Sequence, residues 1–270
     1  MKIRKILETA ANRIGYTVIP NDSLTAIRQR LSEAEESKHA LQLLGLLQVM
    51  RVSNIDRFIK FGNLSCAQLL QDLFVLEQLN FKKNGFFVEF GAADGIRHSN
   101  TYLLENEFGW AGILAEPATI WHKTLNSSRR VKVDTRCVWS ESSKIVEFSE
   151  DMSAELSSAT EDRNQGIHKN RRVDAKSYQV VTVSLNDLLV ENQAPKEIDY
   201  LSIDTEGSEY RILKAFDWNE FKFQVITVEH NFSEERGLIS ELLGSVGYTQ
   251  VYPELSKFDD WYIHEELSNS

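Results

Sequence analysis

The chain has 270 residues, 42% of them hydrophobic and 26% charged, a composition that supports one folded core and excludes wholesale disorder. The formal net charge of -10 argues against nucleic acid as a partner, because nucleic-acid binding depends on Lys and Arg neutralising phosphates. Cys66 and Cys137 are too few for a disulfide framework or a zinc site, and no 18-residue apolar span occurs, so we expect a cytoplasmic protein.

Residues 1–80 predict an N-terminal helical region. Residues 1–16 alternate basic and apolar residues without the apolar core of a signal peptide, and they predict either an amphipathic helix on a membrane surface or a packed terminal helix. Apolar residues recur at helical steps from residue 24 to residue 34, and the charged residues 35–38 predict an interruption. Residues 39–61 are so densely apolar that they need a partner surface, either the rest of the chain or a second subunit of a homo-oligomer.

Residues 81–270 predict a separate α/β domain, because apolar runs of strand length alternate there with helical patterns, as in a doubly wound parallel sheet. The expected strands are residues 86–90, 111–115, 131–138, 198–203 and 223–228, and the expected helices are residues 100–108, 118–125, 207–216 and 234–246. Residues 247–252 and 258–264 predict a closing antiparallel pair at the sheet edge. Residues 150–177 are polar and predict a long loop or lid near the site, with a basic patch at His168, Lys169, Arg171 and Arg172.

The first predicted strand runs into a glycine turn that carries carboxylates. Gly91 and Gly95 let the backbone turn tightly and let a ligand approach main-chain atoms. A dinucleotide-binding turn would have glycine where Ala93 stands, so the pattern disfavours an NAD-dependent oxidoreductase. Glu89 and Asp94 would repel a pyrophosphate but attract the ammonium and sulfonium groups of S-adenosylmethionine. The turn therefore predicts a methyl donor as cofactor.

Two further predicted strands end in acidic residues. Glu116 and Pro117 follow the second strand about 20 residues after the glycine turn, where a doubly wound fold places an acid that binds ribose. Asp204 and Glu206 follow residues 198–203 and precede a helix that opens with Gly207. Since ligands of open α/β sheets bind at the carboxyl ends of the strands, we expect these acids at one site.

Four segments, VEFGAADG, LAEP, IDYLSIDTEGSEYRIL and VEHN, follow one another between residues 86 and 231 and together resemble the FkbM family of S-adenosylmethionine-dependent methyltransferases. The resemblance implies a Rossmann-like class I methyltransferase fold and methyl transfer to hydroxyl oxygens, often on sugars or secondary metabolites. Residues 68–74 are similar to the lead-in of bacterial members. Ser202 departs from the family, since many members carry a lysine there, so any role of that lysine is absent.

The resemblance also implies roles for individual residues. The cofactor loop matches at Glu89, Gly91, Ala92, Asp94 and Gly95, the ribose-binding acid at Glu116 beside Pro117, the methionine carboxylate contacts at Ser99, Asn100 and Thr101, and the adenine contacts at Val138 and Trp139. Two alternatives stay open, because Trp139 could equally be core, and Glu89 and Asp94 could cap turns.

Methyl transfer to an alcohol requires that the hydroxyl lose its proton. The sequence offers His230 or Asp204 as a base, with Glu206 as a further catalytic candidate. Alternatively, Asp204, Glu229 and His230 could bind Mg²⁺ or another divalent cation, which would lower the pKa of the alcohol. A noncatalytic scaffold with the same fold would not need so many acids. We expect a hydroxylated small molecule or a glycan as the acceptor.

Overall fold

The computed structural model describes residues 21–150, 158–159 and 176–268. The chain divides into two compact units, Met1–Leu46 and Leu47–Ser270. Helices α3 (Ile55–Gly62) and α4 (Gln71–Gln78) belong to the second unit, and the proposed division of the chain at residue 80 stays a prediction. The terminal helix predicted at residues 1–16 and the basic patch at residues 168–172 lie outside the described residues.

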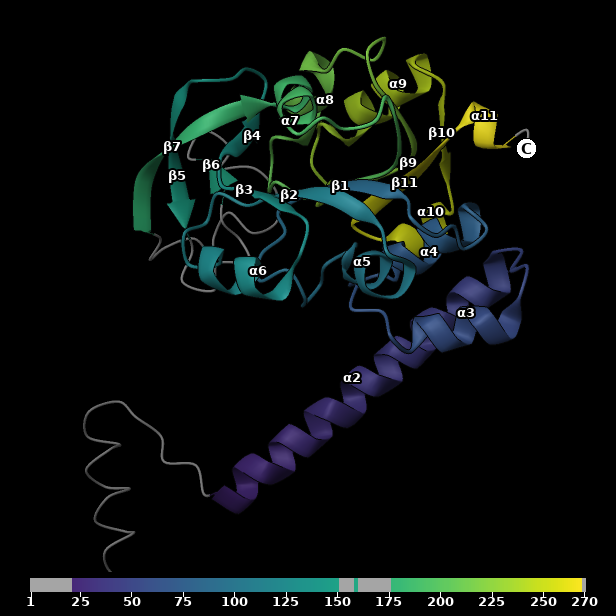
Figure 1. Ribbon diagram of the computed structural model, residues 1–270. Coiled ribbons are helices and arrows are strands. Elements are labelled where there is room, and N and C mark those ends of the chain that lie inside the picture. The colour runs from purple at the N-terminus through teal and green to yellow at the C-terminus, as the bar shows by residue number, and fades with distance from the viewer. Residues whose placement is uncertain (1–20, 151–157, 160–175, 269–270) are drawn as a thin grey trace, which may run out of the picture. The chain divides into compact units, whose positions relative to one another are not determined.

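A seven-stranded sheet forms the centre of the second unit (Figure 1). Its strands lie in the order β10 (Tyr248–Val251), β11 (Asp259–His264), β9 (Lys222–Glu229), β8 (Glu197–Ile203), β1 (Phe86–Phe90), β2 (Ala111–Ala115) and β3 (Lys132–Asp134). Neighbouring strands are parallel, except that β11 runs antiparallel to both β9 and β10. This mostly parallel sheet with a reversed strand next to its edge confirms the Rossmann-like methyltransferase fold predicted from the sequence.

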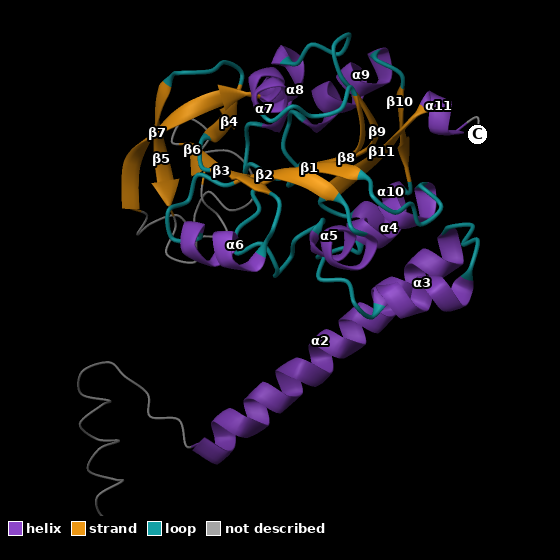
Figure 2. Ribbon diagram, viewed as in Figure 1, coloured by secondary structure: helices purple, strands orange, loops and turns teal. Residues whose placement is uncertain are grey.

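Helices cover both faces of this sheet (Figure 2). One face carries α4, α5 (Tyr102–Phe108) and α6 (His122–Ser128), and the other carries α7 (Leu185–Glu191), α8 (Glu209–Ala215) and α9 (Arg236–Ser245). Short helices α10 (Pro253–Ser256) and α11 (Glu265–Ser268) flank the last strand. The helices that follow β1, β2, β8 and β9 hold the connecting loops at the carboxyl ends of these strands.

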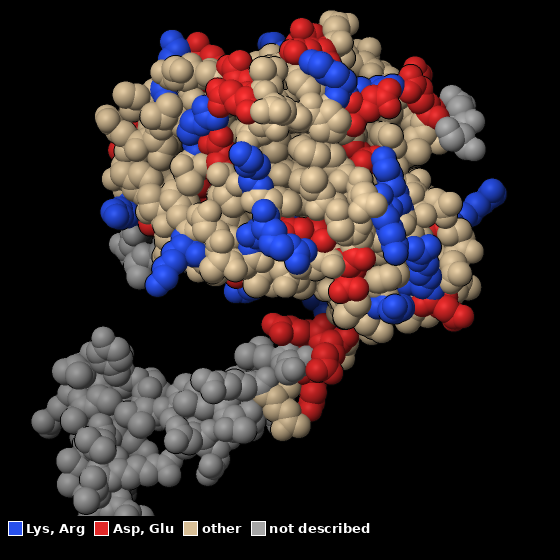
Figure 3. Space-filling model, in the orientation of Figure 1, with Lys and Arg blue, Asp and Glu red and all other residues tan. Residues whose placement is uncertain are grey.

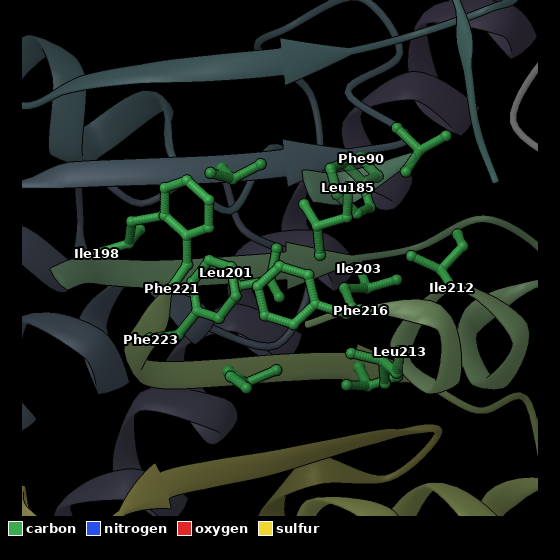
Figure 4. Packing of buried hydrophobic residues seen from close by; sticks show 14 of the residues in the cluster. Phe90, Leu185, Ile198, Leu201, Ile203, Ile212, Leu213, Phe216, Phe221 and Phe223 are labelled. Atoms are coloured by element: carbon green, nitrogen blue, oxygen red, sulfur yellow. The ribbon is translucent and has the colours of Figure 1, made fainter. Parts of the chain in front are cut away.

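The main core lies between the sheet and the α7, α8 and α9 layer (Figure 4). Leu201 and Ile203 of β8 pack there with Leu185 of α7 and Leu213 of α8, and each is at most 2% exposed. Strands buried on both faces need continuous apolar runs, which is why β1, β2, β8 and β9 are readable in the sequence.

A second sheet was not predicted. It contains β4 (Cys137–Trp139), β7 (Lys176–Ser184), β5 (Ile145–Glu150) and β6 (Ser158–Ala159), in this order. The strand predicted at residues 131–138 was wrong in extent, because the chain leaves the central sheet after β3 and pairs with β7 through β4. The loop predicted at residues 150–177 contains β6 and ends where Lys176 pairs with Glu150.

Helix α2 (Asn21–Val49) continues through residues 35–38, so the predicted interruption is wrong. The break comes later, before Asn54, whose side chain accepts a hydrogen bond from the Arg57 N–H (2.9 Å) and so starts α3. None of the helices in the described part of the chain is long and apolar enough to cross a membrane.

Candidate active site

A pocket opens at the carboxyl ends of the parallel strands, the edge where open α/β sheets bind ligands. It is lined by Phe90, Gly91, Ala93, Ala115, Glu116, Pro117, Cys137, Val138, Phe148, Asp204, Thr205, Glu206 and Ser208. The space between these residues, including the part open to solvent, is about 600 Å³.

The glycine turn brings the ends of β1 and β8 into direct contact. Gly91 has a φ of +71°, and a Cβ atom there would lie 2.0 Å from the carbonyl oxygen of Asp204. Only glycine therefore permits this approach. Asp94 accepts hydrogen bonds from the Ile96 and Arg97 N–H groups (both 2.8 Å), so it caps the turn and does not line the pocket. This is the capping alternative that the sequence left open.

Glu116 is buried at the end of β2, in the position predicted for a ribose-binding acid. One of its carboxylate oxygens accepts the Ala93 N–H and the other accepts the Ala118 N–H, both at 2.8 Å. Burial raises the pKa of Glu116 to about 7, although the two backbone donors favour the ionised form. The carboxylate keeps further lone pairs for ligand hydroxyl groups.

Glu89 lies outside the pocket, in a buried polar network beneath the turn. It accepts hydrogen bonds from the Ser99 and Thr101 hydroxyl groups and from the Asn100 N–H (2.8 Å). The buried Arg129 donates to the hydroxyl oxygens of Ser99 (3.0 Å) and Thr101 (2.8 Å) and lies 3.7 Å from Glu89. Glu89, Ser99, Asn100 and Thr101, which the resemblance assigned to the cofactor, thus form hydrogen bonds with one another and anchor the start of α5.

The side of the pocket formed by the second sheet is apolar. Val138 lines the pocket as predicted, and so do Cys137 and Phe148, which the sequence did not single out. Trp139 points elsewhere, because it packs in a small cluster with Cys137 and Val146 and lies under the guanidinium group of Arg211 (4.3 Å to the ring centre). Of the two alternatives for Trp139, the structure supports the core.

Some of the residues that line the first pocket were not identified from the sequence, and only some of them could have been. Phe90 and Ala115 end two predicted strands, and Thr205 and Ser208 flank the predicted acids, so their place at the sheet edge was readable. Phe148 gave no signal, because it belongs to the unpredicted strand β5. Ala92, Gly95 and Asn100 complete the turn without lining the pocket.

Two acids that line this pocket, Asp204 and Glu206, lie close to a third, Glu229. Asp204, Glu206 and Glu229 each offer a carboxylate oxygen, and these oxygens lie within 4.8 Å of one another. Asp204 and Glu229 share a hydrogen bond, and burial raises the pKa of both, with the charge of Asp204 further raising the pKa of Glu229. This acid cluster could hold a shared proton or a divalent cation.

A second pocket adjoins the first through Glu206. It is lined by Glu206, Gly207, Glu209, Glu229, His230, Asn231 and Ser233 and has a space of about 260 Å³. Asp204 faces the first pocket and Glu229 faces the second, so their hydrogen bond links the two. Glu209 stabilises the loop after β8, because it accepts hydrogen bonds from the N–H groups of Thr205 (3.0 Å) and Gly207 (3.1 Å).

His230 is buried and lines the second pocket, but it does not belong to the acid cluster. Its Nδ1 accepts a hydrogen bond from the Phe232 N–H (3.0 Å), which leaves the ring proton on Nε2. Nε2 lies 3.6 Å from Asp260, which also binds Arg236 through two hydrogen bonds of 2.9 and 2.8 Å. Burial lowers the pKa of His230, which keeps the ring neutral. Nδ1 is thus occupied by a backbone N–H, whereas Nε2 is buried, lies beyond hydrogen-bond distance of Asp260 and has no hydrogen-bond partner among the described residues.

Comparison with known proteins agrees with this geometry. A family model described as the methyltransferase FkbM domain matches residues 89–262, a range that contains the residues lining both pockets. Among solved structures, the chain is similar to a precorrin-6y C5,15-methyltransferase of Geobacter metallireducens GS-15, with 12% identity, a TM-score of 0.38, and coverage of 66% of this chain and 71% of that chain. It is also similar to a proposed RNA methyltransferase of Pyrococcus horikoshii, with 12% identity, a TM-score of 0.38, and coverage of 83% and 94%.

These two structural likenesses are too weak to support an argument about function. No curated protein matches the chain. The family model, in contrast, covers more than half of the chain and includes the four segments of the resemblance apart from Val88, while residues 68–74 lie outside it. The chain therefore belongs to the methyltransferase FkbM domain family.

Proposed function

We propose that the protein transfers a methyl group from S-adenosylmethionine to a hydroxyl group of a sugar, a glycan or another hydroxylated metabolite. The observation that carries this proposal is the pair of adjoining pockets. The first lies at the carboxyl ends of the parallel strands and is lined by the buried Glu116, the residue proposed to bind the ribose. The second is lined by hydrogen-bonding side chains and meets the first at the acid cluster.

The cofactor, when bound, supplies an electrophilic methyl group on a sulfonium sulfur. Glu116 would accept hydrogen bonds from the ribose hydroxyl groups, and the apolar wall of Val138 and Phe148 would contact the adenine. The negative charge of Asp204 and Glu206 favours the cationic cofactor over its neutral product.

Asp204 is the proposed base. The acceptor oxygen forms a bond to the methyl carbon, the carbon–sulfur bond breaks with its electron pair going to sulfur, and the hydroxyl proton passes to the Asp204 carboxylate. Glu229, whose pKa is raised well above its usual value by burial and by the charge of Asp204, shares a hydrogen bond with this base. His230 is a weaker candidate, because its Nδ1 is occupied by a backbone N–H and its Nε2 faces Asp260.

A divalent cation such as Mg²⁺ is a second form of the same proposal. It would be bound by Asp204, Glu206 and Glu229, whose oxygens are close enough for one ion, in place of the predicted set with His230. Hard cations prefer carboxylate oxygens, and an ion here would lower the pKa of the acceptor hydroxyl.

We expect Asp204→Asn to lower turnover by about 10²- to 10⁴-fold, the usual contribution of a general base. Turnover is measured as release of S-adenosylhomocysteine with a panel of methyl glycosides, and cofactor binding is measured by calorimetry. The affinity for S-adenosylhomocysteine should stay within about threefold, because the side chain keeps its shape. The control is His230→Asn, which should lose less turnover.

A larger loss in His230→Asn than in Asp204→Asn would reverse the assignment of the base. The same assay in EDTA separates the two forms of the proposal. Full activity in EDTA would leave Asp204 acting without an ion, whereas loss in EDTA and recovery with Mg²⁺ would require the ion at the acid cluster.

Charge supports a small acceptor over nucleic acid. The net charge is -10, and on the face shown in Figure 3 the Lys and Arg side chains lie among Asp and Glu side chains. Phosphate backbones need a continuous basic surface.

We also propose that the protein is cytoplasmic. Residues 1–16 are proposed to contact a membrane surface, and residues 39–61 are proposed to form a homo-oligomer contact.

A further inference from the structure

Phe232 stands exposed beside the second pocket in an unusual backbone conformation. Its side chain is 61% exposed, although large aromatic residues are ordinarily buried. Its φ is +56° and that of Asn231 is +41°, so two consecutive residues with side chains occupy the left-handed region. An exposed ring at such a position buries little apolar surface to offset this strain. The position therefore indicates a role for Phe232 other than stabilising the fold.

The surrounding contacts hold this conformation in place. The Phe232 N–H donates to Nδ1 of His230 (3.0 Å), and the two rings are nearly perpendicular, with centres 5.3 Å apart. The N–H groups of His230 (2.9 Å) and Asn231 (3.1 Å) both donate to the carbonyl oxygen of Phe258. The turn is therefore anchored to the chain just before β11, and Phe232 is presented by a rigid support.

The residues on both sides of Phe232 line the second pocket. Asn231 and Ser233 belong to its lining, together with the carboxylates of Glu206 and Glu229. The Asn231 amide also donates to Glu229 (2.6 Å), which fixes the orientation of that carboxylate. The carboxylates of this pocket can thus accept hydrogen bonds from a ligand, and the apolar ring of Phe232 lies next to the pocket. A molecule with many hydroxyl groups and one apolar face complements both features.

We propose that Phe232 is a specificity residue on which the acceptor sugar stacks. The apolar face of a pyranose ring lies on the phenyl ring, and its hydroxyl groups donate to Glu206 and Glu229 at the edge of the first pocket. This inference rests on the proposed function, because it assumes that the second pocket receives the acceptor. It selects sugar rings over other hydroxylated metabolites that lack a flat apolar face.

The test measures binding of methyl glycosides of glucose, galactose, mannose and rhamnose by saturation-transfer NMR, with the protein saturated with S-adenosylhomocysteine. At least one glycoside should bind, and the linear polyol sorbitol should not. Phe232→Trp should keep the affinity within about threefold, since it retains a flat aromatic surface. Phe232→Asn should weaken binding at least tenfold, while its melting temperature stays equal or rises because Asn tolerates the left-handed region.

The matched control is Ile145→Ala, which removes another exposed apolar side chain (66% exposed) on β5 and should leave glycoside binding unchanged. Equal glycoside affinity in the wild type and Phe232→Asn would overturn the inference, and so would failure of every glycoside to bind. If S-adenosylhomocysteine itself does not bind, the proposed function fails and the inference with it. Binding of S-adenosylhomocysteine without any glycoside overturns the inference alone.

Discussion

Glu116 shows how one side chain can make ligand binding depend on pH. Its two carboxylate oxygens each accept a backbone N–H, and only the ionised form also keeps acceptor sites for both hydroxyl groups of a ribose. Burial raises the pKa of Glu116 to about 7, so the free protein holds a mixture of the two forms near neutral pH. Because the proposed ligand prefers the ionised form, its binding must release a proton whenever Glu116 is protonated.

We therefore expect the affinity for S-adenosylhomocysteine to fall as pH drops below about 7, approaching a tenfold loss per pH unit for one linked proton. Calorimetric titrations between pH 5.5 and pH 8.5 measure this slope. Glu116→Gln should bind weakly at every pH and remove the slope. A steep slope retained in Glu116→Gln would assign the pH dependence to other buried acids, such as Asp72 and Asp259, whose pKa values burial raises to about 7 and about 8.

At the residue scale, the sequence could identify the acids but not their partners. Glu89 and Glu116 both stand at or near strand ends, yet Glu116 lines the pocket and Glu89 faces Ser99, Thr101 and the buried Arg129. Glu89 is held away from the pocket by a network that includes Arg129, 40 positions further along the chain. No local sequence pattern connects this arginine to the glycine turn. The same holds for His230, whose Nδ1 accepts the Phe232 N–H and whose Nε2 has no hydrogen-bond partner in the described part of the chain.

At the element scale, the strand–turn–helix unit of β1 and α5 depends on one close approach. The Gly91 N–H donates to the Ala115 carbonyl oxygen (3.1 Å), and the space for a Cβ atom at Gly91 is filled by the Asp204 carbonyl oxygen. The carboxyl ends of β1, β2 and β8 are thus locked together around the pocket. A side chain at Gly91 would separate β1 from β8 and distort the positions of Asp204 and Glu116.

We expect Gly91→Ala to lower the free energy of unfolding by about 2–4 kcal/mol, from overpacking and a left-handed backbone with a Cβ atom. Urea unfolding measures this change. The control is Gly237→Ala on α9, where a Cβ atom meets nothing within 4 Å, and there the stability should rise by about 0.5–1 kcal/mol. A Gly91→Ala protein as stable as the wild type would disprove the close approach.

The elements that the sequence predicted share one physical property. Strands β1, β2, β8 and β9 are buried on both faces, so their sequences are mostly apolar and mark them clearly. Strands β5 and β7 carry polar and apolar residues in mixed order and pair across a long polar segment. Their pairing depends on contacts distant in sequence, which neither composition nor local periodicity reveals.

At the scale of the whole molecule, the fold concentrates carboxyl groups where the central sheet meets the proposed ligands. Glu116 borders the first pocket, Glu209 and Glu229 border the second, and Asp204 with Glu206 connects the two. Burying these acids raises the pKa of Glu116, Asp204, Glu209 and Glu229, a cost that the apolar core must offset. A noncatalytic scaffold would gain nothing from this arrangement, whereas the proposed cationic cofactor and the proposed alcohol acceptor, which must lose a proton, would both use it.

The most direct test of the account is a calorimetric titration of the whole protein with S-adenosylhomocysteine, with NAD as the control ligand, because binding to the first pocket underlies every proposed step. We predict one site per chain with micromolar affinity for S-adenosylhomocysteine, weakened at least tenfold in Glu116→Gln, and no heat of binding with NAD. Absence of binding to S-adenosylhomocysteine, or tighter binding of NAD, would contradict the proposed methyltransferase function.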